Sequence, residues 1–103
     1  MKNGKEYVIK FSKQAEKDKI KLKSSGLDKN CINILVLMKN DPFCYPLSYE
    51  KLSGDLSGLY SRRINIQHRL VYQVYNESII AGEIEYNGTI KIIRMWTHYY
   101  KVR

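Results

Sequence analysis

The chain has 103 residues, of which 44% are hydrophobic, and a formal net charge of +8, with a sequence pI near 9.5. This length predicts one domain over residues 1–103, with a single modest core. The apolar fraction excludes a disordered basic tail, and the charge indicates either an acidic partner such as nucleic acid or simply a cationic, soluble surface.

Neither the cysteines nor the apolar runs indicate a metal site or a membrane span. Cys31 and Cys44 show no C-x-x-C spacing and no nearby pair of histidines, so no zinc site is expected. No apolar run is long enough to cross a bilayer, and the lysine-rich amino terminus lacks a signal-peptide core. We therefore expect a cytoplasmic protein with reduced cysteines.

The first half of the chain predicts a strand followed by a helical hairpin. Residues 7–11 place Tyr7, Ile9 and Phe11 on one side, as in a strand. Ser12 suits the N-cap of a lysine-rich helix over residues 13–23, and Asp28 suits the cap of a second helix over residues 30–39. The apolar stripe of the second helix, expected in the core, contains Cys31, Ile34, Leu35 and Met38, and Ile32 and Leu37 widen it.

Four extended runs, rich in branched and aromatic residues, are expected in the second half: residues 59–66, 68–75, 79–86 and 89–97. Only Gln67 separates the first two, which indicates antiparallel neighbours. Asn87-Gly88 joins the last two and is a strong hairpin signal, because both turn residues then take positive φ. The order predicts a small α+β domain: an N-terminal strand, a two-helix hairpin, then an antiparallel sheet of about four strands.

Arginines inside these strand runs indicate a face that handles anions. Alternation places Arg63 and Arg69 together on an open face. The same alternation turns these side chains toward the helices: Ile64, Ile66, Leu70, Tyr72 and Val74. Desolvating a guanidinium costs free energy unless it meets an anion. A cationic sheet face that also carries tyrosines is typical of surfaces that hold unpaired RNA.

Glu50 precedes these strands and His98 follows them. A carboxylate, an arginine and a histidine suffice to cut RNA at its own 2′-hydroxyl: one group takes the hydroxyl proton, a cation meets the charge that builds on the phosphate, and one group protonates the leaving oxygen. The pattern alone leaves open that both residues are ordinary exposed side chains.

Three segments together resemble the signature of the YoeB/Txe family, which belongs to the RelE superfamily of bacterial toxin endoribonucleases. They are Leu56–Ile64 (LSGLYSRRI), His68–Tyr72 (HRLVY) and Trp96–Tyr99 (WTHY). The resemblance implies a RelE-like, microbial RNase-like fold that cleaves mRNA, typically in the ribosomal A site, and so inhibits translation and growth. It implies no metal or organic cofactor, since the ribose supplies the nucleophile.

Carried over residue by residue, the resemblance assigns five catalytic positions. Glu50 matches the general base, Arg69 the phosphate-stabilising arginine and His98 the general acid. Tyr99 matches the terminal tyrosine, and Arg63 a second active-site arginine.

Further cations expected to contact RNA are Arg62, Lys51 and Arg94, although Arg62 has the opposite parity and could equally be a surface residue. His68 is expected to be a structural, hydrogen-bonded histidine on the packing face. Two segments depart from compact members of the family, namely the longer stretch over residues 76–89 and the extension Tyr100–Arg103, which could shape or partly block the RNA groove.

The expected partners are mRNA, the ribosome and a cognate YefM/Phd-like antitoxin with an acidic, partly disordered segment that folds over the groove. No membrane is expected, and a homodimer is left open. The alternative is a catalytically silent module of the same fold that binds an antitoxin, DNA or RNA. A weaker alternative is a basic protein of the ribosome surface.

Overall fold

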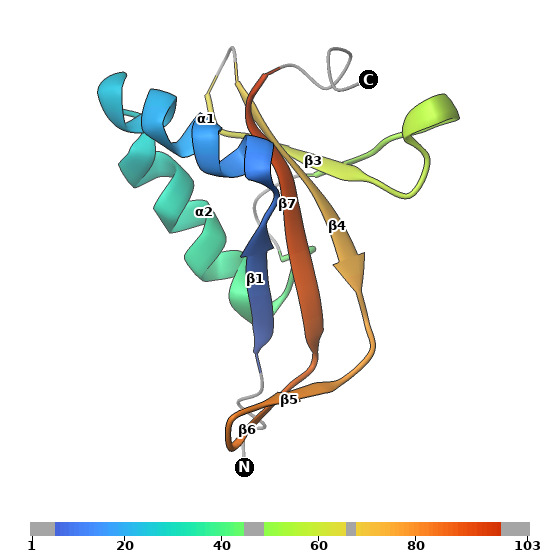
Figure 1. The fold of residues 1–103 in the computed structure, drawn as a ribbon. Helices are drawn as coiled ribbons and strands as arrows, with labels where there is room; N and C mark the ends of the chain where they lie inside the picture. Colours follow the sequence, from blue (N-terminus) through green and yellow to red (C-terminus); the bar gives the residue numbers. More distant parts are fainter. Residues whose placement is uncertain (1–5, 45–48, 66–67, 98–103) are drawn as a thin grey trace.

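Two helices cover one face of a five-stranded sheet in the computed structural model, which describes residues 6–44, 49–65 and 68–97 (Figure 1). The helices are α1 (Lys13–Ser24) and α2 (Asp28–Asn40). The strands, in spatial order, are β1 (Tyr7–Phe11), β7 (Gly88–Thr97), β4 (Arg69–Tyr75), β3 (Tyr60–Arg63) and β2 (Glu50–Lys51). The 3-10 helix η1 (Gly54–Leu56) precedes β3, and β5 (Ile79–Ala81) pairs with β6 (Ile84–Tyr86) in a separate hairpin. The predicted α+β class, with its N-terminal strand and helical hairpin, is confirmed.

The sheet is mixed rather than wholly antiparallel. β2, β3, β4 and β7 form an antiparallel part with four strands. The expected four strands included residues 79–86 rather than β2, and those residues instead form the separate β5–β6 hairpin. β1 lies parallel to β7 at the edge, with Tyr7 opposite Gly88 and Phe11 opposite Ile92. Parallel neighbours need a long crossover. Here the described chain between β1 and β7 contains both helices and all the remaining strands.

The two helix starts differ from each other. Ser12 caps α1 as predicted: its Oγ accepts a hydrogen bond from the Ala15 N–H at 3.0 Å. Asp28 does not cap α2, because it is already the first helical residue. α1 ends in a Schellman motif, in which the Gly26 N–H donates to Lys23 and the Leu27 N–H to Leu22. α2 follows this motif directly, so Leu27 occupies the N-cap position without a capping side chain.

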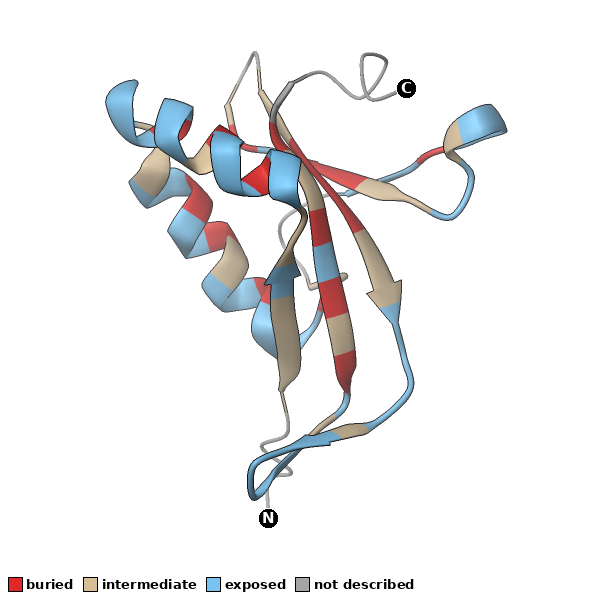
Figure 2. Cartoon of the chain, in the orientation of Figure 1, coloured by how far each residue is buried: buried red, intermediate tan, exposed pale blue. Residues whose placement is uncertain are grey.

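The core lies between the helices and one face of the sheet. It contains Ala15, Leu22, Cys31, Ile34, Met38, Ile64, Leu70, Tyr72, Ile90, Ile92 and Met95, with Val74 and Leu35 packed against it. Ile32 and Leu37 are exposed on the outer side of α2, so their expected place in the core is wrong. This confirms the predicted helix-facing parity of Ile64, Leu70, Tyr72 and Val74; Ile66 lies outside the described residues. Burial raises the pKa of the Cys31 thiol to about 11, as expected for a core residue. Figure 2 shows buried residues alternating with more exposed ones along β7.

β7 does not keep a strict alternation. Tyr72 lies opposite Ile92, whereas its neighbour Val71 lies opposite Arg94, so β7 has one extra residue at this point. Such a bulge reverses the alternation that follows it. Met95 therefore joins Ile90 and Ile92 in the core, whereas Arg94 does not.

The predicted hairpin at Asn87-Gly88 is also wrong. The Asn87 N–H donates to the Glu6 carbonyl at 2.9 Å, next to β1, and neither residue has positive φ. The turn is instead at Gly82, with φ 64°, so residues 79–86 form two short strands (Figure 1). At position 88 a Cβ would overlap the Tyr75 carbonyl oxygen, so close strand approach requires glycine there.

Within the described ranges, no helix has the length and apolar character needed to cross a membrane.

Candidate active site

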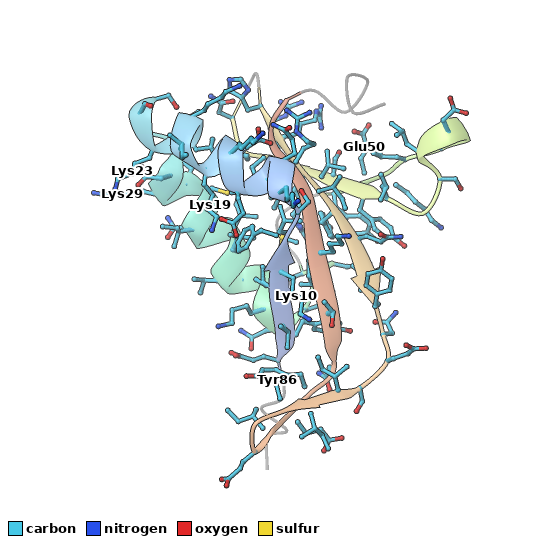
Figure 3. The ribbon with its side chains drawn as sticks, viewed as in Figure 1. Lys10, Lys19, Lys23, Lys29, Glu50 and Tyr86 are labelled. Carbon is cyan, nitrogen blue, oxygen red and sulfur yellow. The ribbon has the colours of Figure 1, made fainter. Side chains whose placement is uncertain are left out.

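A hollow of about 450 Å³ opens at the β2 side of the sheet, away from the core. It is lined by Tyr49, Glu50, Ser61, Arg63 and Arg69. Strand pairing produces this grouping, since Glu50 lies opposite Ser61 and Arg63 lies opposite Arg69. Figure 3 places Glu50 at the β3 side of the sheet, whereas Lys19, Lys23 and Lys29 lie on the helices. Three of the predicted site residues, Glu50, Arg63 and Arg69, therefore line one hollow.

Glu50 and Arg69 form an ion pair in this hollow. Arg69 Nη1 lies 3.3 Å from Glu50 Oε1, with side chains 20% and 52% exposed respectively. The Arg63–Arg69 pair places two positive charges side by side, which is unfavourable without an anion nearby. The Glu50 carboxylate supplies part of that compensation. An ion pair this accessible to water typically contributes only about 0.2–1 kcal/mol, so an incoming anion can displace it.

Ser61 and Tyr49 also line the hollow, although neither was predicted as a site residue. Ser61 is fully buried, and its hydroxyl has no hydrogen-bond partner among the described residues. Its parity with Arg63 is visible in the sequence, yet nothing there shows that it lies opposite Glu50. Tyr49 is 44% exposed and packs against the rings of Phe43 and Tyr60, with centroids 4.9 Å and 5.9 Å apart.

Arg62 is not on the surface that was expected to contact RNA. It is 1% exposed, and its Nη2 donates to the carbonyl oxygens of Pro42 at 2.7 Å and Cys44 at 3.4 Å. The Tyr72 hydroxyl donates to the same Pro42 oxygen at 2.9 Å, and burial raises the pKa of Tyr72 to about 12. The guanidinium carbon of Arg62 lies 5.6 Å from the centre of the Tyr49 ring. Arg62 therefore fastens residues 42–44 to the sheet on the core side, because its parity is opposite to that of Arg63.

Arg94 is likewise turned away from the hollow. Its Nε donates to Asp18 Oδ2 of α1 at 2.9 Å, and the Met95 N–H donates to the same oxygen at 2.9 Å. Burial raises the pKa of the Asp18 carboxyl, but the hydrogen bonds from Arg94, Met95 and Gln14, together with the Arg94 charge, outweigh that effect and lower it. The expected RNA contact of Arg94 is therefore corrected to a helix–sheet ion pair.

The remaining predicted residues are placed as follows. Lys51 is exposed on β2 next to Glu50 but does not line the hollow. His98 and Tyr99 lie outside the described residues. His68 is half-buried just before β4. Its backbone N–H donates to Asn65 Oδ1 at 2.7 Å, and its backbone carbonyl accepts from the Ile64 N–H at 2.8 Å. His68 thus helps to close the connection between β3 and β4.

The arrangement offers two chemical abilities. Two guanidinium groups can hold one phosphate through charge-assisted hydrogen bonds. A half-exposed carboxylate beside them can accept a proton from a bound hydroxyl. Among the residues that the structure describes, no group of three His, Cys, Asp or Glu side chains is placed to hold a metal ion.

Comparison with known proteins points to one family. The family described as "YoeB-like toxin of bacterial type II toxin-antitoxin system" matches residues 11–99. The toxin YoeB of Streptomyces coelicolor is 40% identical over 57 residues, which cover 54% of this chain and 68% of that protein.

Solved structures are similar to the whole described fold. The toxin chain of the YoeB–YefM complex from Staphylococcus aureus is 33% identical, with a TM-score of 0.68 over 90% of this chain and 98% of its own. The structure of a YoeB dimer from Staphylococcus aureus is 31% identical, with a TM-score of 0.66 over the same shares of the two chains.

Proposed function

The chain belongs to the YoeB-like toxins of bacterial type II toxin–antitoxin systems, and we propose that it is an endoribonuclease that cleaves mRNA during translation. The observation that carries this proposal is the hollow in which a carboxylate, Glu50, lies against Arg69 and beside Arg63. A toxin that acted only by binding would need the two arginines but would not need a proton acceptor beside them. Arrest of translation and growth follows from cutting the message, and the site of action is the cytoplasm.

In the proposed reaction the ribose 2′-hydroxyl attacks the adjacent phosphorus. Glu50 takes the hydroxyl proton as general base, the new P–O bond forms, and the bond to the 5′-oxygen of the next nucleotide breaks. The products are a 2′,3′-cyclic phosphate and a 5′-hydroxyl. General base catalysis of this kind typically contributes about 10²–10⁴ in rate.

Arg69 and Arg63 are proposed to hold the phosphate as its negative charge grows. Arg69 would exchange part of its contact with Glu50 for the phosphate, which the small free energy of an exposed ion pair allows. That exchange also frees the carboxylate for the hydroxyl proton. Removing one donor that stabilises a transition state commonly costs about 10²–10³ in rate.

His98 is proposed as the general acid that protonates the leaving 5′-oxygen, with Tyr99 beside it. This assignment rests on the family signature in Trp96–Tyr99. Lys51, exposed next to Glu50, is proposed to contact the RNA backbone. Glu50 and His98 together account for both proton transfers, so the proposed reaction needs no metal ion.

The proposed protein partner is a YefM-like antitoxin, because a relative in Staphylococcus aureus was solved as a YoeB–YefM complex. An acidic segment of that partner would compete with RNA for the cationic hollow and gain affinity as it folds. A homodimer is proposed on the same basis, from the YoeB dimer of that organism.

The experiment is RNA cleavage by the purified chain, with analysis of the product ends. We expect 5′-hydroxyl and 2′,3′-cyclic phosphate ends, and cleavage reduced at least 100-fold by Glu50→Gln. Glu83→Gln is the matched control, since Glu83 is an exposed glutamate in the β5–β6 turn. If RNA is bound but not cut, and Glu50→Gln is as toxic as the wild type, the silent-binder alternative replaces this proposal.

A further inference from the structure

A second hollow, of about 480 Å³, lies over β1, β7 and β4. It is bordered by Lys10 of β1, Thr89 and Lys91 of β7, Tyr75 of β4, and Glu77 and Ile79 at the start of the β5–β6 hairpin. Figure 3 shows Lys10 on β1, on the other side of β7 from Glu50. Nothing in the proposed reaction uses these residues.

The two lysines are neighbours by strand pairing. Lys10 lies directly opposite Lys91 in the parallel β1–β7 pair, and both are exposed. Like charges at opposite positions destabilise a sheet. Neither lysine forms an ion pair with a residue in the described ranges, and Glu77 is the single carboxylate lining the hollow. The site is therefore net positive and would be relieved by an anion.

This hollow and the Glu50 hollow share one face of the sheet. Arg69, Val71, Gln73 and Tyr75 have the same parity on β4, opposite to the core residues Leu70 and Tyr72, and Val71, between the two hollows, is fully buried. Lys91 lies opposite Gln73, four residues along β4 from Arg69. At the usual rise per residue that is about 13 Å, so one extended strand of RNA can reach from the first hollow to the second.

We propose that Lys10 and Lys91 form a second phosphate site, which binds the RNA strand on one side of the nucleotide being cut. Tyr75, which is 43% exposed, offers a ring on which a base can stack, and its hydroxyl donates to Gln73 Oε1 on the same strand at 2.7 Å, which orients the ring. This inference rests on the proposed function. An exposed aromatic ring that borders the same hollow as the two lysines favours single-stranded RNA over an acidic protein.

The test is the salt dependence of RNA binding, measured by fluorescence anisotropy on a 12-nucleotide RNA that carries 2′-O-methyl groups so that it cannot be cut. The variant is Lys10→Gln/Lys91→Gln. The control is Lys13→Gln/Lys17→Gln, which removes the same net charge from exposed positions on α1. For single strands the slope of log K against log salt is about 0.7 for each phosphate neutralised. The variant is expected to lower the slope by about 1.4, and the control to leave it unchanged.

Cleavage kinetics give a second readout. The Lys10→Gln/Lys91→Gln variant should raise KM and leave kcat unchanged, because the lysines bind the strand away from the reacting atoms. Equal slopes for the variant and the wild type, with RNA still bound and cut, would overturn the inference alone. A loss confined to binding of an acidic protein partner would overturn it too. If the wild type neither binds nor cuts RNA, the proposed function fails.

Discussion

Arg62 and Arg63 are adjacent in β3, yet their side chains meet opposite environments. Arg63 is exposed in the Glu50 hollow, whereas Arg62 is buried and donates to the Pro42 and Cys44 carbonyl oxygens. A strand turns successive side chains to opposite faces, so one arginine is available to a ligand and the other holds the chain that leads toward Glu50. Replacing each arginine by glutamine therefore separates the two properties: position 62 reports on stability and position 63 on activity.

Arg62→Gln is expected to lower the free energy of unfolding by about 1.5–3 kcal/mol, because hydrogen bonds from a charged donor to buried carbonyl oxygens are lost. Arg63→Gln should change it by less than about 0.5 kcal/mol, as for most exposed positions, and should instead slow RNA cleavage. Urea unfolding and cleavage rates of both variants check this. Equal stability losses would contradict the assignment of Arg62 as structural.

Alternation along β3 and β4 was enough to predict which of their residues share a face, including the pairing of Arg63 with Arg69. It could not predict that the Pro42 carbonyl would meet Arg62, because that contact joins segments 20 residues apart. For the same reason Ser61 was placed on the correct face but not opposite Glu50. Contacts that depend on how a loop returns to the sheet carry no local signal.

At the scale of elements, Asp18 joins α1 to β7. Its carboxylate is fully buried and accepts from the Arg94 side chain and the Met95 N–H. Its pKa lies below the ordinary 3.8 in the folded chain. The ionised form is thus favoured by folding, and the resulting stability is present above pH 3.8 and is lost as the pH falls through the folded pKa.

Asp18→Asn is therefore expected to destabilise the protein by about 1.5–3 kcal/mol at pH 7, and by progressively less as the pH falls below 3.8. Urea unfolding at pH 7, 5, 3 and 2 measures the difference. Glu83→Gln, at an exposed turn position, is the control and should show little effect. A difference from the wild type that stays constant down to pH 2 would contradict the role of the carboxylate.

Gly88 begins β7 where that strand approaches Tyr75. Gly88→Ala should cost about 1–3 kcal/mol, because the added methyl group would overlap the Tyr75 carbonyl oxygen. Thermal or urea unfolding measures the loss. Ile80→Ala, at a side chain that is 73% exposed on β5, serves as a control with little expected change. An unchanged free energy of unfolding for Gly88→Ala would contradict the requirement for glycine at this close approach of β7 to β4.

Element types were predictable from periodicity, whereas pairing was not. The β7 bulge reverses the parity after Ile92, and nothing in a regular apolar alternation announces an extra residue. The Asn-Gly signal failed because Asn87 is already bonded beside β1, and this contact joins the residue before β1 to the residue before β7. Long-range pairing overrode a local turn preference in both cases.

At the scale of the whole molecule, the positive charge is divided between two layers. α1 carries many of the lysines on the outside of the helical layer, while Arg63, Arg69, Lys10 and Lys91 lie on the other face of the sheet. Among the described residues, the second group borders hollows that contain both a carboxylate and an exposed tyrosine. RNA binding is therefore assigned to the sheet face rather than to the helical lysines.

If those four cations each neutralise one phosphate, the salt slope for single-stranded RNA is about 2.8. Raising the salt from 50 to 200 mM should then weaken binding about 50-fold. Anisotropy titrations at four or more salt concentrations measure the slope. An affinity that does not change with salt would contradict phosphate-led recognition.

The most direct test is to map the 5′ ends of cellular transcripts shortly after induced expression in bacteria, for the wild type and for Glu50→Gln. The account predicts new 5′ ends at reproducible positions within translated messages for the wild type and none for the variant, which should also relieve growth arrest. Growth arrest by both proteins, with no new ends from either, would contradict it.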